Sequence, residues 1–190
     1  SSDPSEGTAS LAALTFGAAN WDEPQTVTVT GVDDWLGDGD VWFQIITAAA
    51  VSPDAKYSGR NAADLTLKNV DDDTAGFTLD KTQVTVGEDG TTDAFTVVLD
   101  AQPVTDVVLD ISSSNAAEAT VDRPRLTFTP ADWNLPQTVT ITAVDDAAVD
   151  GAVASTVTVS VVDASSDDAW DDVADQTVSV TTHDNDSAGF

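Results

Sequence analysis

Apolar and polar residues alternate with a period of two along most of the second half of the chain. This period places every second side chain on one face of a β-strand, whereas a helix needs a period of about 3.6. Almost no stretch has the helical period, and β-branched residues dominate, so the predicted fold class is all-β. The pattern predicts strands at Phe77–Val86, Ala94–Asp100, Asp106–Ser112, Ala119–Thr129, Gln137–Val144, Val153–Val162 and Gln176–Thr182.

Two of these strands carry signs of a break. We expect the first to break near Asp80–Lys81. Pro124 predicts a kink or a sheet edge within the fourth, because proline cannot donate a ladder hydrogen bond. The residues expected to face the core are Phe95, Val97, Leu99, Val107, Leu109, Ile111, Leu126, Phe128, Val139, Ile141, Val144, Val157, Val159 and Val161.

The chain contains an internal repeat. Residues 14–34 read LTFGAANWDEPQTVTVTGVDD and residues 126–146 read LTFTPADWNLPQTVTITAVDD, so 14 of these 21 positions are identical. The segment DDDTAGF at residues 71–77 likewise returns as DNDSAGF at residues 184–190, an offset of 113. Such a repeat is too long for a solenoid or a propeller and fits one β-sandwich per unit.

The first unit is incomplete in this alignment. Ser1 corresponds to Ser113, so unit 1 has no counterpart of the first three strands. A half sandwich with a bare apolar face should not be stable alone, and we expect preceding strands or a partner segment to complete it. That face would consist of Leu14, Phe16, Val27, Val29, Phe43, Ile45, Leu65 and Leu67. The predicted domains are a partial sandwich at 1–74, a complete one at 75–186 and the start of the next linker or repeat at 187–190.

The composition excludes several classes of protein. With 34 acidic and 6 basic residues the net charge is −28, which disfavours nucleic acid and anionic membrane as partners. The absence of cysteine excludes disulfides and thiolate chemistry, and no apolar run is long enough to span a membrane. Neither a nucleophile elbow, a catalytic triad spacing nor a phosphate loop occurs, so we do not expect an enzyme.

Acidic loops of unit 2 should meet at one end of the sandwich. In an antiparallel path of seven strands alternate loops lie at opposite ends. The loops at Glu88, Ser113–Glu118 and Asp145–Gly151 share the end from which the last strand exits. The carboxylates expected to converge there are Glu88, Asp89, Asp145, Asp146, Asp150, Asp184 and Asp186. Aspartates also occur in ordinary turns, where they bond their own backbone, and for an isolated pair that interpretation would be preferred. Seven acids from separate loops favour a cation instead.

Calcium suits this set of residues best. Ca²⁺ takes about 6–8 oxygen ligands in irregular geometry, so carboxylates from several loops can serve it. Zn²⁺ prefers histidine and cysteine, and the chain has one histidine and no cysteine. Mg²⁺ demands a tighter octahedral arrangement and gives up its water reluctantly, so flexible loops favour it less.

Four acidic elements of unit 2 follow one another in a recognisable order. They are a glutamate in a glycine turn (VGEDG), a Val-Asp-Asp pair (AVDD), an acid followed by glycine (VDG) and a terminal acidic triplet (DND). In this order unit 2 resembles the Calx-beta repeat family, over essentially all of residues 77–186. Unit 1 is similar to the variant in giant repetitive RTX-type bacterial adhesins, through SPDAKYSGRNAADLTLKNVDDD at Ser52–Asp73.

The resemblance implies tandem immunoglobulin-like sandwiches of Greek-key type with Ca²⁺ at one tip. Carried onto this chain, it implicates Glu88, Asp145, Asp146, Asp150, Asp184 and Asp186 as metal ligands. Asp150 stands where the family often has glutamate, and Asn185 interrupts the terminal triplet. Both departures make the ligand set shorter or less charged, so we expect a lower affinity or fewer ions.

Unit 1 carries a similar set of acids at its own exit. The expected ligands there are Asp33, Asp34, Asp38, Asp71, Asp72 and Asp73. The last three adjoin Gly76, the most permissive of residues, at the joint to unit 2. Like charges at such a joint repel, so we expect Ca²⁺ to make it rigid.

These features predict a structural function. We expect calcium-rigidified extender repeats of a large secreted adhesin, which contact neighbouring repeats and project a distal ligand-binding module from the bacterial surface. Because the sequence begins without methionine, we expect it to be a fragment. The alternative is a carbohydrate- or peptide-binding module, or a split domain beside an inserted one, that uses the unit 1 aromatics Trp35, Trp42, Phe43 and Tyr57. Trp21 and Trp133, at matching positions, are expected to cover the end of the core.

Overall fold

The computed structural model describes residues 1–189 and divides the chain into two compact units. Unit 1 comprises residues 1–34 and 38–72, and unit 2 comprises residues 35–37 and the chain from Asp73 onward. Phe190, the last residue of the expected segment 187–190, lies outside the described residues. Within them, no helix is long and apolar enough to cross a membrane.

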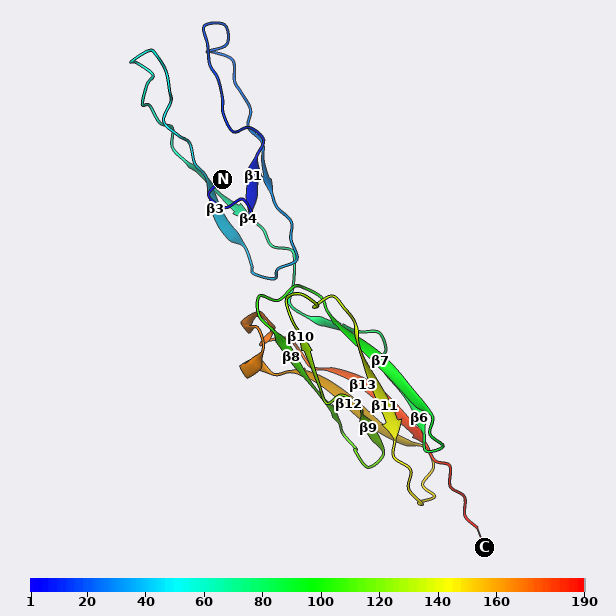
Figure 1. Ribbon diagram of the computed structural model, residues 1–190. Helices are drawn as coiled ribbons and strands as arrows, with labels where there is room; N and C mark the ends of the chain where they lie inside the picture. Colours follow the sequence, from blue (N-terminus) through cyan, green and yellow to red (C-terminus); the bar gives the residue numbers. More distant parts are fainter. Residues whose placement is uncertain (190) are drawn as a thin grey trace. The chain divides into compact units, whose positions relative to one another are not determined.

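Unit 2 is an all-β sandwich of two sheets (Figure 1). One sheet has the order β10-β8-β12-β13-β6 and the other the order β5-β7-β11-β9. Every pair is antiparallel except β13 with β6, which is parallel. The strands are β5 Phe77–Leu79, β6 Gln83–Gly87, β7 Thr92–Leu99, β8 Val107–Ser113, β9 Ala119–Val121, β10 Arg125–Phe128, β11 Gln137–Ala143, β12 Val153–Val161 and β13 Gln176–His183. Two 3₁₀ turns, η1 Asp163–Ser165 and η2 Asp168–Trp170, precede β13.

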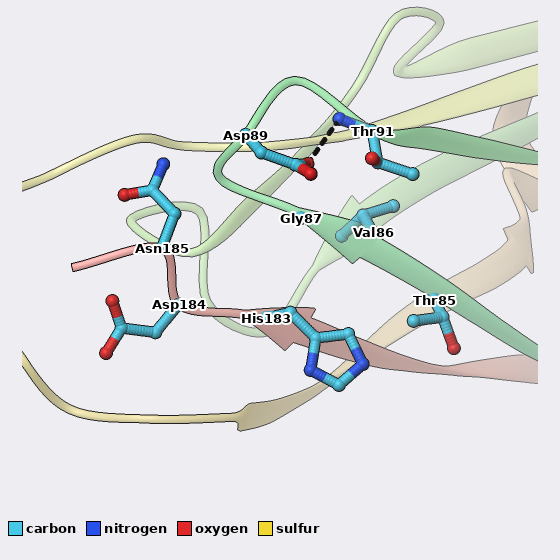
Figure 2. Close-up of a pocket in the computed structure, with 8 residues that line it drawn as sticks. All are labelled: Thr85, Val86, Gly87, Asp89, Thr91, His183, Asp184 and Asn185. Atoms are coloured by element: carbon cyan, nitrogen blue, oxygen red, sulfur yellow. Dashed lines mark hydrogen bonds between the residues drawn. The ribbon is translucent and has the colours of Figure 1, made fainter. Parts of the chain in front are cut away.

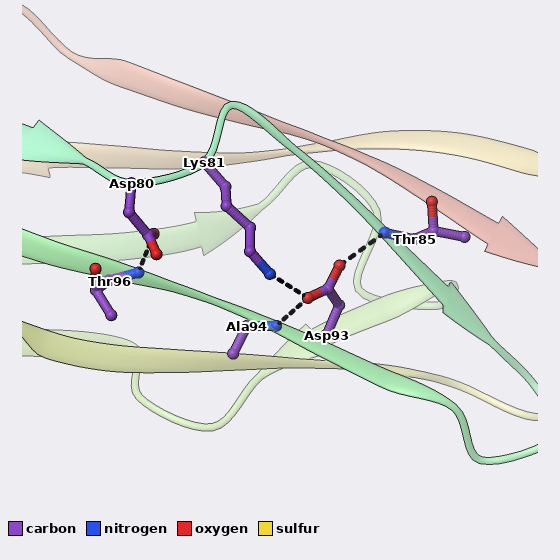
Figure 3. A network of polar contacts seen from close by, with 6 residues as sticks. All are labelled: Asp80, Lys81, Thr85, Asp93, Ala94 and Thr96. Atoms are coloured by element: carbon purple, nitrogen blue, oxygen red, sulfur yellow. Dashed lines mark hydrogen bonds and ion pairs between the residues drawn. The ribbon is translucent and has the colours of Figure 1, made fainter.

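Both expected breaks are points at which the chain changes sheet. The first predicted strand divides into β5 and β6, which belong to different sheets, and the strand with Pro124 divides likewise into β9 and β10. Figure 3 shows the contacts around the first switch. There Lys81 Nζ lies 2.6 Å from the Asp93 carboxylate, which also accepts a hydrogen bond from the Thr85 N–H at 3.3 Å. The hydrogen bond from Thr85 of β6 to Asp93 of β7 connects these two strands, which belong to different sheets.

The core of unit 2 consists of the predicted alternating residues. Nearly all of them are buried, and only Val144 and Val161 at strand ends are half-buried. Trp170 of η2 is also buried, and its indole N–H donates to the Gly76 carbonyl oxygen at 3.3 Å. Removing apolar surface from water stabilises a fold by roughly 25 cal/mol per Å², so this core is the main stabilising term of unit 2.

Unit 1 has short strands in the register of its counterpart. They are β1 Gly7–Ala9, β2 Val29–Gly31, β3 Val41–Ile45 and β4 Leu65–Asn69, paired β1 with β2 and β3 with β4. Gly7 pairs with Gly31 as Ala119 pairs with Ala143, and Val41 pairs with Asn69 as Val153 pairs with Thr182. The four strands therefore reproduce β9, β11, β12 and β13 in part.

The expected apolar face of unit 1 is largely uncovered. Leu14, Phe16 and Leu65 are 41%, 54% and 52% exposed, whereas their counterparts Leu126, Phe128 and Val178 are at most 2% exposed. Leu14 and Phe16 lie outside any strand, although Leu126 and Phe128 form part of β10. The reason is the partner: β10 pairs with β8, and unit 1 has no counterpart of β8. Beyond the paired strands both halves of unit 1 continue as long loops (Figure 1).

Candidate metal centre

Four loops of unit 2 bring acids to the end where β13 exits. β6 and β13 are parallel, so the turn after β6 lies beside the last residues of β13, and the Glu88 N–H donates to the His183 carbonyl at 3.0 Å. The loop between β11 and β12 reaches the same place because Val153 pairs with Thr182. The loop before β9 joins them through the Val144 N–H, which donates to the Glu118 carbonyl at 2.8 Å.

Three carboxylates lie close enough to share one ion. Oxygen atoms of Glu88, Asp184 and Asp186 all lie within 4.8 Å of one another. Two oxygens on one Ca²⁺ can be separated by at most about twice the bond length of 2.3–2.6 Å, so this spacing fits. Glu88 Oε2 and Asp186 Oδ2 are buried and have no hydrogen-bond partner. A buried carboxylate oxygen without a partner is costly, which favours a proton or a cation at that point.

Glu88 is buried among other negative charges, an environment that favours a bound cation. Its side chain is 8% exposed. Burial raises the pKa of Glu88, and the negative charges of Asp146, Asp184 and Asp150 raise it further, although a hydrogen bond from the Asn185 backbone lowers it. Both causes of the rise disfavour the charged form, and a bound cation would relieve both.

Asp184 is held in place by the backbone of the surrounding loops. Its Oδ2 accepts a hydrogen bond from the Gly151 N–H at 2.9 Å, and its Oδ1 accepts one from the Asp186 N–H at 2.6 Å. These backbone hydrogen bonds lower the pKa of Asp184, against a smaller effect of burial. Gly151 can present its N–H because it adopts a φ of +75°, which glycine tolerates best. Asp184 is therefore a charged, fixed anchor of the cluster.

The other predicted ligands lie in the loop between β11 and β12. Asp145 accepts a hydrogen bond from Asn185 Nδ2 at 3.3 Å, so the residue that interrupts the triplet connects two loops. Asp146 accepts one from the Ala148 N–H at 2.6 Å. Asp150 is exposed. The structure brings Asp146 and Asp150 near enough for their charges to act on Glu88, but their carboxylates lie outside the tight three-residue group.

Glu118 is a further buried acid at this end of the sandwich, outside the three-residue group, and the sequence motifs did not identify it. It is 9% exposed, and its Oε2 is buried without a hydrogen-bond partner. Burial raises the pKa of Glu118, followed by the charges of Asp150 and Asp146. It stands alone in a polar loop, so no local pattern marked it. The available signal was topological, since its loop was already assigned to this end of the sandwich.

Asp89 points elsewhere. Its carboxylate accepts a hydrogen bond from the Thr91 N–H at 3.0 Å, within the turn between β6 and β7 (Figure 2). The hydrogen bonds from Thr91 lower the pKa of Asp89. Asp89 and His183 line a small pocket together with Asn185 and Asp184. Asp89 was expected to converge with the other acids, but its carboxylate stabilises its own turn.

Unit 1 repeats the central hydrogen bond of this site. Asp71 Oδ2 accepts from the Gly39 N–H at 2.6 Å, as Asp184 Oδ2 accepts from Gly151, and Gly39 has a φ of +79°. Loss of solvent around Asp38 raises its pKa, and the charges of Asp34 and Asp71 raise it further. The structure therefore brings Asp34, Asp38 and Asp71 near enough for their charges to interact, but among the described residues no three acids of unit 1 form a group as tight as that of unit 2.

The remaining acids of unit 1 are placed differently. Asp33 and Asp72 are exposed, and Asp73 belongs to unit 2, so the expected triplet is divided between the units. Glu6, the counterpart of Glu118, is 9% exposed and its Oε2 accepts a hydrogen bond from Asn69 Nδ2 at 3.3 Å. Unit 1 has no counterpart of Glu88, because that residue follows a strand that unit 1 lacks.

The tryptophans at matching positions have different environments. Trp133 is half-buried against the core of unit 2, as expected for a residue that covers the end of a sandwich. Trp35 also belongs to unit 2, and its ring centroid lies 6.1 Å from that of Trp133. Trp21 is 70% exposed, so its expected role in covering a core is not realised in unit 1.

The chemistry of the donors fits calcium. The cluster supplies carboxylate oxygens from several loops, three of them buried without a partner. Its one imidazole, His183, is exposed, and the sequence offers no thiolate. Hard oxygen donors in an irregular arrangement are the ligands that Ca²⁺ prefers.

No protein-family model matches the chain, and no curated protein matches its sequence. Solved structures of similar fold exist. The apo-form Calx CBD1 domain aligns with 60% of this chain and 100% of that domain, at 15% identity and a TM-score of 0.45. The E. coli chaperone DraB aligns with 61% of this chain at 10% identity and a TM-score of 0.44, and the chain spans 59% of that protein.

A third similar structure is PapD-like domain 7 of human CEP192, with 59% of this chain and 87% of that domain aligned at 12% identity and a TM-score of 0.43. All three TM-scores lie below 0.5. The β-sandwich therefore rests on the strand pairing of this chain, and the site rests on its own residues.

Proposed function

We propose that the acidic end of unit 2 binds Ca²⁺ and that the bound ion stabilises the folded unit. The observation that carries this proposal is the convergence of Glu88, Asp184 and Asp186 within 4.8 Å, with two of their oxygens buried and unpartnered. Glu118, Asp146 and Asp150 surround this group with further negative charge. A cation removes the repulsion and satisfies the unpartnered oxygens at once.

Calcium titration with thermal unfolding tests this proposal. A ligand that binds only the folded state stabilises it by RT ln(1 + [L]/Kd), about 4 kcal/mol at a thousandfold excess. The melting temperature should therefore rise by many degrees between chelator and millimolar Ca²⁺. Glu88→Gln and Asp186→Asn keep the side-chain volume and should each weaken binding, measured by calorimetry.

Asp175→Asn is the matched control, because Asp175 is exposed and lies in the loop before β13, outside the cluster. It should bind Ca²⁺ like the unchanged chain. An equal melting temperature in chelator and in Ca²⁺ would exclude the proposal.

At the level of the whole protein, we propose that the units are extender repeats of a secreted bacterial surface adhesin. Tandem repetition, the β-sandwich and acids at the end of each unit support this function. Ca²⁺ held near Asp71–Gly76 would stiffen the joint between repeats. The maximum dimension measured by small-angle scattering should then be longer, and its spread narrower, with Ca²⁺ than with chelator. Asp72→Ala with Asp73→Ala should reproduce the chelator profile while both units stay folded, and identical profiles in both buffers would exclude stiffening.

A ligand-binding module is the second candidate. Trp42 and Tyr57 of unit 1 are 68% and 62% exposed, whereas Phe43 is buried. Exposed aromatic rings can stack on sugars or peptide side chains. A glycan array probed with the unchanged chain and with the Trp42→Ala variant would separate the two functions. A binding module should bind a glycan and lose that binding in the variant, whereas an extender repeat should bind no glycan in either form.

A further inference from the structure

Two hydroxyl groups without a hydrogen-bond partner lie next to the acids of unit 2. Among residues 1–189, the buried side-chain oxygens that have no partner are Glu88 Oε2, Glu118 Oε2, Asp186 Oδ2, Ser155 Oγ and Thr182 Oγ1. Three of these belong to carboxylates, which accept hydrogen bonds, whereas the two hydroxyl groups can donate. A buried polar group without a partner is costly, so the two hydroxyl groups need an explanation of their own.

Thr182 lies beside Glu88. β6 and β13 run parallel toward the acidic end (Figure 2), and Thr182 is opposite Val86 in their register. Val86 and Thr182 are both fully buried, so both side chains point into the sandwich. The ladder continues to Glu88, whose N–H donates to the His183 carbonyl at 3.0 Å. Because residues two apart on an extended chain share a face, the buried Glu88 extends from the same face as Val86.

Ser155 lies beside the loop of Glu118. The Ser114 N–H donates to the Thr156 carbonyl at 2.8 Å, and the Thr156 N–H donates to Ser114 Oγ at 2.9 Å. Continued by one residue, this antiparallel register places Ser155 level with Asn115, whose carbonyl accepts a hydrogen bond from the Glu118 N–H at 3.1 Å. Ser155 is 8% exposed, so its hydroxyl group also faces inward. Each of the two hydroxyl groups is therefore level with one buried glutamate.

Packing alone does not explain these two residues. Further along the inward faces of β12 and β13 the buried positions are occupied by valine, at Val157, Val159, Val178 and Val180. Valine has the shape of threonine and carries no polar atom to desolvate, so it would fill position 182 equally well. The hydroxyl groups stand only where the inward faces reach the acids, which indicates a role toward the acids.

We propose that Thr182 and Ser155 are positioning residues of the calcium site, whose hydroxyl groups donate hydrogen bonds to the carboxylates of Glu88 and Glu118 and hold them oriented toward the ion. Removal of a hydrogen-bond donor to a metal-binding group typically weakens metal binding by about 10–100-fold. Because a site that binds no ion needs no oriented ligand, this role rests on the calcium binding proposed above.

Two substitutions at position 182, compared by calorimetric titration with Ca²⁺, test this role. Thr182→Val keeps the shape of the side chain and removes the hydroxyl group, whereas Thr182→Ser keeps the hydroxyl group and removes a buried methyl group. Thr182→Val should raise the Kd for Ca²⁺ by about tenfold, and Thr182→Ser by less than about twofold. In chelator the melting temperature should fall in Thr182→Ser, which leaves a small cavity, but not in Thr182→Val.

The opposite orders of affinity and stability separate positioning from packing. A residue that only packs would weaken Ca²⁺ binding most in the variant that is least stable, Thr182→Ser. Ser155→Ala should also raise the Kd by about tenfold. Thr177→Val and Ser179→Ala are the matched controls, because both residues are exposed on β13, and they should bind Ca²⁺ like the unchanged chain.

The result also distinguishes this role from the calcium site itself. If the unchanged chain binds Ca²⁺ and Thr182→Val binds it with the same Kd, the hydroxyl group has no part in binding and the positioning role is overturned, while the calcium site stands. A larger loss of affinity in Thr182→Ser than in Thr182→Val would overturn it as well. If the unchanged chain binds no Ca²⁺ in the same titration, the proposed function fails, and the positioning role fails with it.

Discussion

The two units share sequence and register, yet only one of them has a core. Over 21 aligned positions 14 residues are identical, and the hydrogen bond from glycine to aspartate at the exit is the same in both. Nevertheless β2 has 3 residues where β11 has 7, and β3 has 5 where β12 has 9. Strand length and burial here follow from the presence of partner strands rather than from local sequence. Substitutions at equivalent positions of the two units test this explanation.

The largest difference should come from the paired phenylalanines. Phe128→Ala removes a fully buried ring and should destabilise unit 2 by about 3–5 kcal/mol. Phe16→Ala removes a ring that is 54% exposed and should change stability by less than about 0.5 kcal/mol. Urea unfolding of the full chain, followed by exchange of amides in each unit, measures both. Equal losses would show that unit 1 has a core of its own.

Unit 2 should bind Ca²⁺ more tightly than unit 1, because it has more carboxylates available at its acidic end. Unit 2 has Glu88 and Glu118 at its acidic end, whereas Glu6 is the one counterpart of these two residues in unit 1, and Glu6 is already hydrogen-bonded to Asn69. Fewer and less available carboxylates weaken a calcium site. We therefore expect Glu118→Gln to raise the Kd of the tighter site by about tenfold or more, and Glu6→Gln to affect only the weaker one. Calorimetric titration resolves the two classes of site. The comparison would fail if Glu118→Gln left the tight site unchanged.

Part of the fold could be read from the sequence, and part could not. Phe95, Val97 and Leu99 alternate, which placed them in a strand, and Pro124 marked a change of sheet because proline disrupts the ladder. Leu14 and Phe16 carry the same local pattern as β10, yet they form no strand. Strand pairing depends on a second segment of the chain. The alternation of Leu14 and Phe16 therefore does not produce a strand where no counterpart of β8 is present.

The candidate site shows the same division. Asp184 and Asp186 were found because they stand in a recognisable triplet, and Glu88 because it stands in a glycine turn. Glu118 has no such surroundings in the sequence, and its burial becomes evident only when its loop is packed against β11. Conversely, Asp89 is adjacent to Glu88 but bonds its own turn. Side-chain direction at a turn is decided by local hydrogen bonds that spacing does not reveal.

The two loop glycines should give equal and smaller effects. Gly39 and Gly151 have positive φ, and a Cβ at either would meet no atom within 4 Å. Alanine should therefore cost only the backbone strain of the left-handed region, about 1–2 kcal/mol in each unit. Thermal unfolding of Gly39→Ala and Gly151→Ala checks this, with Gly189→Ala as a control at an open position where no positive φ is adopted. Unequal costs would mean that the two acidic loops are built differently despite their shared hydrogen bond.

The smallest effect should be a dependence on pH in the absence of metal, to which the two buried glutamates of unit 2 contribute and, in unit 1, Asp38. Burial and the charges of Asp150 and Asp146 raise the pKa of Glu118 above its usual value of 4.5, and burial with neighbouring charge raises the pKa of Glu88 likewise. Between 4.5 and the raised values the folded state binds protons that the unfolded state has released. The free energy of unfolding in chelator should therefore increase as the pH falls from 7 through this window, and decrease as the pH rises. Asp167 acts in the opposite direction at lower pH. Burial raises its pKa, but hydrogen bonds from Thr105, Ala169 and Val104 outweigh burial and lower the pKa below its usual value of 3.8. The stability that ionised Asp167 provides is therefore lost as the pH falls below 3.8.

Glu118→Gln keeps the shape of the protonated acid and cannot ionise, so it should flatten the slope above 4.5 in chelator. Glu6→Gln in unit 1 is the matched control, because it leaves both buried glutamates of unit 2 in place. With Ca²⁺ present the sign should reverse, since protons then compete with the ion for the same oxygens and acid weakens binding. Melting curves at several pH values in chelator and in Ca²⁺ measure both slopes. A chelator slope that survives both Glu118→Gln and Glu88→Gln would locate the proton uptake elsewhere, and the buried glutamates would no longer distinguish the two units.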